Sequence, residues 1–191
     1  MVWTMTRIVV IDPQPAVRAG LGMMLRTEPG LVPVGAAVGG RDGLKLVSHQ
    51  RPDVVVLDGS DLATCRKLRA LDPAPRVVLY AAGDDPSLPV AARVAGADGL
   101  VAKEAPAEEL YEAIRLVARG GTALPPLDRA QLDAAAHRVE PEDLALLAML
   151  VDRTEPAEVA ATLRLDRRRM ARRIERLLVR LRERRARPRP A

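Results

Sequence analysis

Two aspartates and one lysine stand at the ends of short apolar runs in the first 120 residues of the chain. Asp12 closes the run RIVVID, Asp58 closes DVVVLD, and Lys103 directly follows GLVA. Runs of this length and composition are typical of strands buried in a parallel sheet. Such sheets bind ligands at the edge where their strands end. We therefore expect Asp12, Asp58 and Lys103 to form an acidic pocket with one cation.

The rest of the composition excludes several kinds of chemistry. The 191 residues include one cysteine, Cys65, and two histidines, so we expect neither a disulfide framework nor a metal site of thiolates or imidazoles. Cys65 itself is expected to pack in the core. The sequence has no glycine-rich phosphate loop of the nucleotide-binding kinds. No nucleophile stands beside a general base near the predicted pocket, so we expect a non-enzymatic protein without a cofactor.

The elements that position the pocket alternate between strand and helix. The apolar patterns predict strands at 7–12, 31–38, 53–58, 76–81 and 99–102, and helices at 15–26, 42–50, 62–71, 87–95 and 106–119. This alternation predicts an α/β domain with a flavodoxin-like, doubly wound five-stranded parallel sheet. We expect the domain to span residues 1–120. A linker follows at 121–138, in which AQLDAAAH is expected to form a short helix.

The positive charge is gathered near the C-terminus. Residues 1–138 hold 16 basic and 16 acidic residues, whereas the chain from Arg164 onward holds 13 arginines and 3 acids. A neutral body with a basic end indicates a polyanionic partner. The codon bias of a GC-rich genome explains why 27 of the 30 basic residues are arginine, but it does not explain their clustering.

Three helical stretches follow the linker, at 141–151, at 156–163 and from 167 to ~184. The first is expected to bury Leu144, Leu147 and Leu150. Only a tight turn separates the second from the third, as in a helix-turn-helix. We therefore expect an all-α helix-turn-helix domain at 139–184. The arginines and prolines of 185–191 predict a disordered basic tail.

The third of these helices predicts a surface for double-stranded DNA. Asp166 is a favourable N-cap for it. Its apolar stripe consists of Met170, Ile174, Leu177, Leu178 and Leu181, and the opposite face carries Arg168, Arg172, Glu175, Arg176 and Val179. Arginines on an exposed helix face can read guanine and neutralise phosphates in the major groove. The simpler alternative is a charged face that is only solvated.

Residues 6–120 resemble the receiver domain of bacterial two-component response regulators, and most of all the NarL/FixJ subfamily. The resemblance is carried by the segments IDPQPAVRAGL, RPDVVVLD, LRALDPAPRVVLY and AGADGLVAKEAPAEEL, and by the spacing between them. It implies that Asp58 is equivalent to the phosphoacceptor and that Lys103 contacts the phosphoryl group. It also implies that Asp12 helps to hold Mg²⁺.

Three positions depart from the family pattern, and we refer to them as the degenerate positions. Pro13 replaces a metal-binding acid, Ala81 replaces the hydroxyl residue that bonds the phosphoryl group, and Leu100 replaces the aromatic partner of the switch. Proline offers no side-chain oxygen to Mg²⁺. We therefore expect a degenerate receiver with no metal site, controlled by a small molecule or a protein. The alternative is a conventional receiver switched by phosphorylation of Asp58, with Asp61 in place of the lost metal ligand.

Residues 139–182 resemble the LuxR-type helix-turn-helix without gaps. The resemblance places the family's base-reading positions at Ala171, Arg172 and Glu175; a lysine is usual at the first, and the third is commonly basic. The sequence RERRARPRPA stands where the family has a fourth helix used for dimer contact, so a homodimer would form through the receiver or the linker. The residues expected at the DNA are Arg168, Arg169, Ala171, Arg172, Arg173, Glu175, Arg176 and Arg180.

Taken together, these features predict a DNA-binding transcriptional regulator of the response-regulator type. No run of ~18 apolar residues and no secretory leader is evident, so we expect a cytoplasmic protein that does not enter a membrane. A conventional response regulator switched at Asp58 is the first alternative. An RNA-binding antiterminator is the second, and the tight helix-turn-helix match argues against it.

Overall fold

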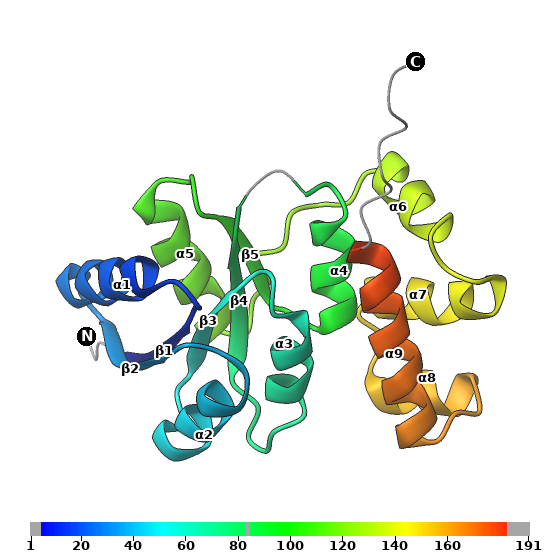
Figure 1. Ribbon diagram of the computed structural model, residues 1–191, viewed down its shortest axis with the longest axis horizontal. Coiled ribbons are helices and arrows are strands. Elements are labelled where there is room, and N and C mark those ends of the chain that lie inside the picture. Colours follow the sequence, from blue (N-terminus) through cyan, green and yellow to red (C-terminus); the bar gives the residue numbers. More distant parts are fainter. Residues whose placement is uncertain (1–4, 83–84, 183–191) are drawn as a thin grey trace. The chain divides into compact units, whose positions relative to one another are not determined.

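The computed structural model describes residues 5–82 and 85–182, so the predicted basic tail at 185–191 lies outside the described residues. The chain divides into two compact units (Figure 1). Of the described residues, 5–82, 85 and 95–126 form what we call the sheet unit, and 86–94 and 127–182 form the helical unit. No helix within the described ranges is long and apolar enough to cross a bilayer.

The sheet unit is built on five parallel strands in the order β2-β1-β3-β4-β5, which confirms the predicted fold class. The strands are β1 (Thr6–Ile11), β2 (Leu31–Ala37), β3 (Val54–Asp58), β4 (Arg76–Ala81) and β5 (Gly99–Ala102). The order places β1 and β3 side by side, with β4 and then β5 beyond β3. The chain segments that leave β1, β3 and β5 therefore emerge at one edge of the sheet.

Helices cover both faces of this sheet because side chains alternate between the faces along each strand. Ile8 and Val10 of β1 belong to the core under α1 (Pro15–Thr27) and α5 (Ala107–Ala118). On the other face, Ile11 lies so close to Gly43 of α2 (Gly40–Gln50) that a Cβ there would stand 2.7 Å from it. Helix α3 (Leu62–Arg69) packs beside α2.

Cys65 of α3 is fully buried, and burial raises the pKa of its thiol to about 12. Its Sγ contacts the carbonyl of Ala95 at 3.6 Å. A thiol in this setting is a packing residue, because the thiolate is the reactive form of cysteine.

The helical unit contains short helices and one long one. They are α4 (Leu88–Ala95), of which residues 88–94 fall in this unit, α6 (Arg129–Ala136), η1 (Pro141–Asp143), α7 (Leu144–Val151), α8 (Pro156–Thr162) and α9 (Arg167–Arg182). Helix α6 is the short helix predicted in the linker, and Asp128 and Gln131 close its N-terminus as a reciprocal capping box.

One detail of the predicted helix at 141–151 is wrong. The segment begins as the 3₁₀ turn η1, and Leu144, the first residue of α7, is 40% exposed. Leu146 is buried in its place, together with the expected Leu147 and Leu150. At about 100° per residue, Leu146, Leu147 and Leu150 share one face of α7, and Leu144 lies at the edge of that face.

Helix α9 packs as its pattern predicts. Met170, Ile174, Leu177, Leu178 and Leu181 are all buried. Asp166 accepts a hydrogen bond from the backbone N–H of Arg169 at 2.8 Å, which confirms the predicted N-cap. Arg164 in the turn before α9 has a φ of 50°, a left-handed conformation that lets the chain reverse within a few residues.

Candidate functional site

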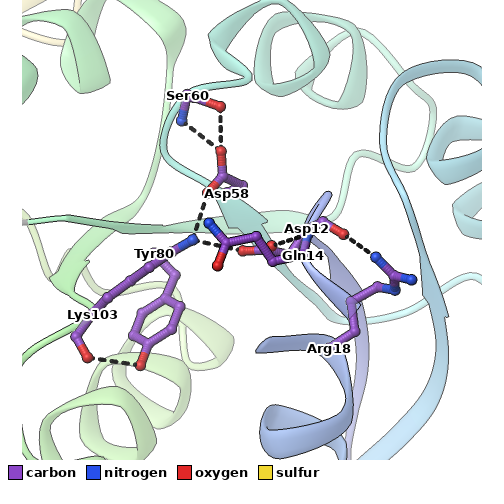
Figure 2. A network of polar contacts seen from close by, with 7 residues as sticks. All are labelled: Asp12, Gln14, Arg18, Asp58, Ser60, Tyr80 and Lys103. Atoms are coloured by element: carbon purple, nitrogen blue, oxygen red, sulfur yellow. Dashed lines mark hydrogen bonds and ion pairs between the residues drawn. The ribbon is translucent and has the colours of Figure 1, made fainter. Parts of the chain in front are cut away.

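The ends of β1, β3 and β5 bring Asp12, Asp58 and Lys103 together, as the sequence predicts (Figure 2). The Lys103 ammonium lies between the two carboxylates. Its Nζ is 2.8 Å from Asp12 Oδ2 and 2.6 Å from Asp58 Oδ1. The Asp12 side chain is 2% exposed and that of Asp58 is 11% exposed. A single cation thus bridges two buried anions.

The outward-facing carboxylate oxygens of this pair are also bonded. Asp12 Oδ1 accepts from the backbone N–H of Gln14 at 2.7 Å, and Arg18 donates to the Asp12 carbonyl. Asp58 Oδ2 accepts from both the backbone N–H and the hydroxyl of Ser60. Every carboxylate oxygen of Asp12 and Asp58 therefore has a donor from the protein, as Figure 2 shows.

The hydrogen bonds of this network stabilise the charged forms of Asp58 and Lys103. Burial raises the pKa of Asp58, but hydrogen bonds from Lys103 and Ser60 outweigh it, so the pKa lies below its ordinary value. Burial lowers the pKa of Lys103, and its bonds to Asp12 and Asp58 raise it above the ordinary value. Asp58 and Lys103 therefore form an ionised pair at neutral pH.

The loop after Asp58 lies against the end of β4. The Gly59 backbone N–H donates to the Tyr80 carbonyl at 3.0 Å, and a Cβ at Gly59 would stand 2.2 Å from the Ala81 Cβ. The degenerate position Ala81 thus makes room for this close approach. The same loop brings the Ser60 hydroxyl to Asp58, so a hydroxyl does reach the carboxylate, although from the loop and not from β4.

The sequence did not single out Ser60 or Gly59. A Gly-Ser pair directly after a strand end is a turn signal, but it does not say that the strand-end carboxylate will accept from that turn. Tyr80 is partly buried and packs against the core. Its hydroxyl also donates to the Lys103 carbonyl at 3.2 Å, and its ring centroid lies 5.9 Å from Lys103 Nζ.

The pocket residues do not fit Mg²⁺. Mg²⁺ requires several oxygen ligands in near-octahedral geometry, and the oxygens of Asp12 and Asp58 already face protein donors. Pro13 adds none. Asp61 caps α3 by accepting from the Thr64 N–H at 3.0 Å, and its other oxygen faces the Gly40 N–H at 3.4 Å. Among the described residues, no three His, Cys, Asp or Glu side chains form a group able to hold a metal.

Leu100, the third degenerate position, is half-buried in β5, paired in register with Leu79. The aliphatic side chain of Leu100 has no polar atom, so it cannot form a hydrogen bond that depends on the state of Asp58. The backbone around it is fixed as well, because the Lys103 N–H donates to the Ala81 carbonyl at 2.7 Å.

The second predicted site lies on α9. The residues opposite its apolar stripe are exposed, as expected: Arg168, Ala171, Arg172, Glu175, Arg176 and Val179. Arg169 is also exposed and pairs with Asp166 at 3.5 Å within its own helix turn. This exposed face carries a row of three arginines, Arg168, Arg172 and Arg176, together with the carboxylate of Glu175.

Two of the arginines expected at the DNA are engaged inside the helical unit. Arg173 Nε lies 2.6 Å from Asp143 Oδ1, and Asp143 is buried. Arg173 also donates to the Glu142 carbonyl. Arg180 lies 2.7 Å from Glu140. No local pattern reveals these pairs, because their partners stand 30 or more residues earlier in the chain.

Known proteins match both the sequence and the fold. The family model of the response regulator receiver domain matches residues 8–115. The response regulator GacA of Pseudomonas aeruginosa is 33% identical over 144 residues, which cover 73% of this chain and 67% of GacA. The chain spans about two thirds or less of the length of such curated relatives.

Among solved structures, a two-component response regulator of the LuxR family from Aurantimonas sp. is 31% identical, with a TM-score of 0.60. The match covers 71% of this chain and 99% of the Aurantimonas chain. RcsB from Salmonella enterica serovar Typhimurium bound to a promoter covers 93% of this chain and 92% of its own, at 15% identity and a TM-score of 0.60.

Another structure, of two RcsB dimers bound to two parallel DNAs, covers 92% and 91%, at 16% identity and a TM-score of 0.61. The RcsB matches show likeness of fold alone. Since the family model covers more than half of the residues, the chain belongs to the response regulator receiver domain family.

Proposed function

We propose that this protein is a cytoplasmic, DNA-binding transcriptional regulator of the response-regulator type, and not an enzyme, whose receiver acts without phosphorylation of Asp58. The observation that supports a receiver independent of phosphorylation is the position of Lys103 between the two carboxylates. Its ammonium pairs with both carboxylates, and Ser60 and Gln14 bond the remaining oxygens. Lys103 offsets one of the two carboxylate charges, and every carboxylate oxygen already has a donor from the protein.

Phosphoryl transfer to an aspartate needs an exposed carboxylate oxygen and charge stabilisation for the transferred group. Here Asp58 must first lose its bonds to Lys103 and Ser60. Pro13 and Ala81 remove two groups that the family uses for the metal and for the phosphoryl oxygen. The substitutions at Pro13 and Ala81 both remove groups used in phosphoryl transfer to the aspartate. This favours a receiver that is not phosphorylated at Asp58.

The conventional switch is the second candidate, and one observation favours it. Asp12, Asp58 and Lys103 are all present and in contact. A receiver of purely structural value could have replaced them with apolar residues, since a buried ion cluster is often no more stable than an apolar one.

DNA binding rests on α9. Its exposed arginine row lies opposite a fully buried stripe, so the helix is presented rigidly. RcsB is bound to a promoter and to DNA as dimers in its own structures, which supports a homodimer on DNA here. The input of such a regulator is then a small molecule or a protein.

The deciding experiment is selection of genomic double-stranded fragments on purified protein that has never met a phosphodonor. We expect recovery of one sequence motif, with the same affinity after acetyl phosphate and Mg²⁺ are added and in the Asp58→Asn variant. Affinity that rises with acetyl phosphate in the native protein but not in Asp58→Asn would establish the conventional switch. Tighter binding to single-stranded RNA than to any duplex would instead favour an antiterminator.

A further inference from the structure

A group of basic side chains lines a groove between α2 and α3 of the sheet unit. Arg41, Lys45 and His49 follow one another at intervals of four residues along α2, and Lys67 comes from α3. The groove has a volume of about 680 Å³. Its lining consists of Arg41, Leu44, Lys45, Ser48, His49 and Lys67, with no acidic side chain from the described part of the chain. We call it the α2–α3 groove.

These four side chains differ from most other basic residues of the sheet unit, which have partners. The paired ones include Arg7 with the Gln50 carbonyl, Arg69 and Arg76 with Asp98, Lys103 with Asp12 and Asp58, and Arg115 with Glu28. Within residues 5–82 and 85–182, the side chains of Arg41, Lys45, His49 and Lys67 form neither a hydrogen bond nor an ion pair. The fold therefore uses neither the charges of Arg41, Lys45 and Lys67 nor the imidazole of His49.

The arrangement also opposes the stability of α2. Like charges four residues apart on a helix repel each other. Arg41 stands in the first turn, where the helix dipole is positive and disfavours a cation. Asp42 is the one acid in α2, and it does not line the groove. A bound anion would turn this repulsion into attraction.

We propose that the α2–α3 groove binds a small molecule that carries two or more phosphate groups. Lysine and arginine are the side chains that bind phosphate most strongly, through charge-assisted hydrogen bonds. Ser48 adds a hydroxyl, and Leu44 adds an apolar floor for the uncharged part of the ligand.

A macromolecular occupant fits less well. Protein interfaces are anchored by apolar and aromatic side chains, and Leu44 is the one apolar residue in the lining. A duplex would need phosphate contacts spread along a longer surface, such as the arginine row of α9. The groove is thus distinct from the proposed DNA surface, and the inference does not depend on how Asp58 behaves.

The test is a titration of the full chain with tripolyphosphate, followed by ¹H–¹⁵N correlation spectra. We expect saturable shifts of the amides of α2 and α3, separate from any shifts in α9. ATP in a second titration shows whether a nucleoside strengthens binding. An acidic peptide, poly-glutamate, provides the protein-like probe.

The variant Lys45→Glu/Lys67→Glu reverses two charges in the groove and should weaken tripolyphosphate binding at α2 and α3 by about tenfold or more. The matched control Arg26→Glu/Arg119→Glu makes the same change of charge at exposed arginines outside the groove and should leave it within about twofold. If charge reversal prevents folding, Lys45→Gln/Lys67→Gln serves in its place.

Three results would overturn the proposal. One is the absence of saturable shifts in α2 and α3. Another is an equal loss of affinity in the groove variant and in the control, which would mean general charge attraction. The third is saturable binding of poly-glutamate at the groove with none of tripolyphosphate, which would assign the surface to an acidic protein.

Discussion

At the scale of single residues, the main feature of the pocket is the pairing of one lysine with two aspartates. The Lys103 ammonium lies within 2.8 Å of both Asp12 and Asp58, so the two carboxylates share one cation that the protein supplies. Ser60 bonds the second oxygen of Asp58. The reactive group of the family is thus the most heavily bonded side chain of the pocket.

Replacing Lys103 by methionine tests this bridge through the pH dependence of stability. We expect the free energy of unfolding to fall by about 2 kcal/mol at pH 7, between the values for exposed and buried pairs. The pKa of Asp58 is lowered, so its contribution is lost as pH falls through that pKa. The pKa of Lys103 is raised, so its contribution is lost as pH rises through it. The difference from the native protein should therefore be largest between about pH 4 and pH 10.

Urea unfolding at a series of pH values measures that difference. The control is Lys67→Met, which removes a lysine that makes no ion pair and should change little at any pH. A loss in Lys103→Met that stayed constant from pH 3 to pH 11 would mean that the side chain acts by packing alone.

The contact between Gly59 and Ala81 gives a second residue-scale prediction. Gly59→Ala would place a Cβ 2.2 Å from the Ala81 Cβ, so the loop must move away from β4. We expect a loss of about 1–3 kcal/mol in the free energy of unfolding, as for other overpacked sites. Gly20→Ala is the control, because nothing lies within 4 Å of its Cβ, and this change within α1 should stabilise by roughly 0.5–1 kcal/mol. Equal effects of the two changes, measured by thermal or urea unfolding, would contradict the close approach.

At the scale of elements, α9 has two kinds of arginine that look alike in sequence. Arg172 is exposed, whereas Arg173 bonds Asp143 and the Glu142 carbonyl and so fastens α9 to the segment before α7. The buried apolar stripe fixes the rotation of the helix. Arg172 therefore belongs to the proposed DNA surface, whereas Arg173 stabilises the packing of the helical unit.

We expect Arg172→Ala and Arg173→Ala to separate these roles. Arg172→Ala should weaken specific DNA binding by ~1–3 kcal/mol and change the stability by no more than about 0.5 kcal/mol. Arg173→Ala should cost about 3 kcal/mol of stability, because it leaves the carboxylate of Asp143 buried and unpaired. Each variant is the control for the other in paired unfolding and DNA-binding measurements. Equal stability losses in both would refute the distinction.

At the scale of the whole molecule, the proposed regulator combines a sheet unit whose charges nearly balance with a helical unit whose last helix is basic. A monomer presents one recognition helix, and helix-turn-helix proteins gain affinity by placing two on successive turns of the duplex.

We expect footprints on two half-sites about one helical turn, or roughly 34 Å, apart. Inserting half a turn between the half-sites should lower affinity strongly, while inserting a full turn should restore part of it. Gel-shift titrations on the three duplexes measure this. Equal affinity for all three, or for an isolated half-site, would show that the protein binds as a monomer.

The sequence by itself determined the sheet and the long helix. Unbroken apolar runs specify buried strands, and parallel pairing brings the ends of those strands to one edge, so the sequence alone places Asp12, Asp58 and Lys103 together. The stripe of α9 likewise determined which of its faces is buried, because a helix has a fixed rotation per residue.

Only the tertiary structure decided what these groups bond. The Ser60 hydroxyl reaches Asp58 because a loop without periodicity folds over Ala81, and Asp61 turns to the start of α3 and to Gly40. The pair of Arg173 with Asp143 spans 30 residues, and the α2–α3 groove joins two helices. Such contacts depend on distances between segments that local patterns leave free, so they could not be read from the chain.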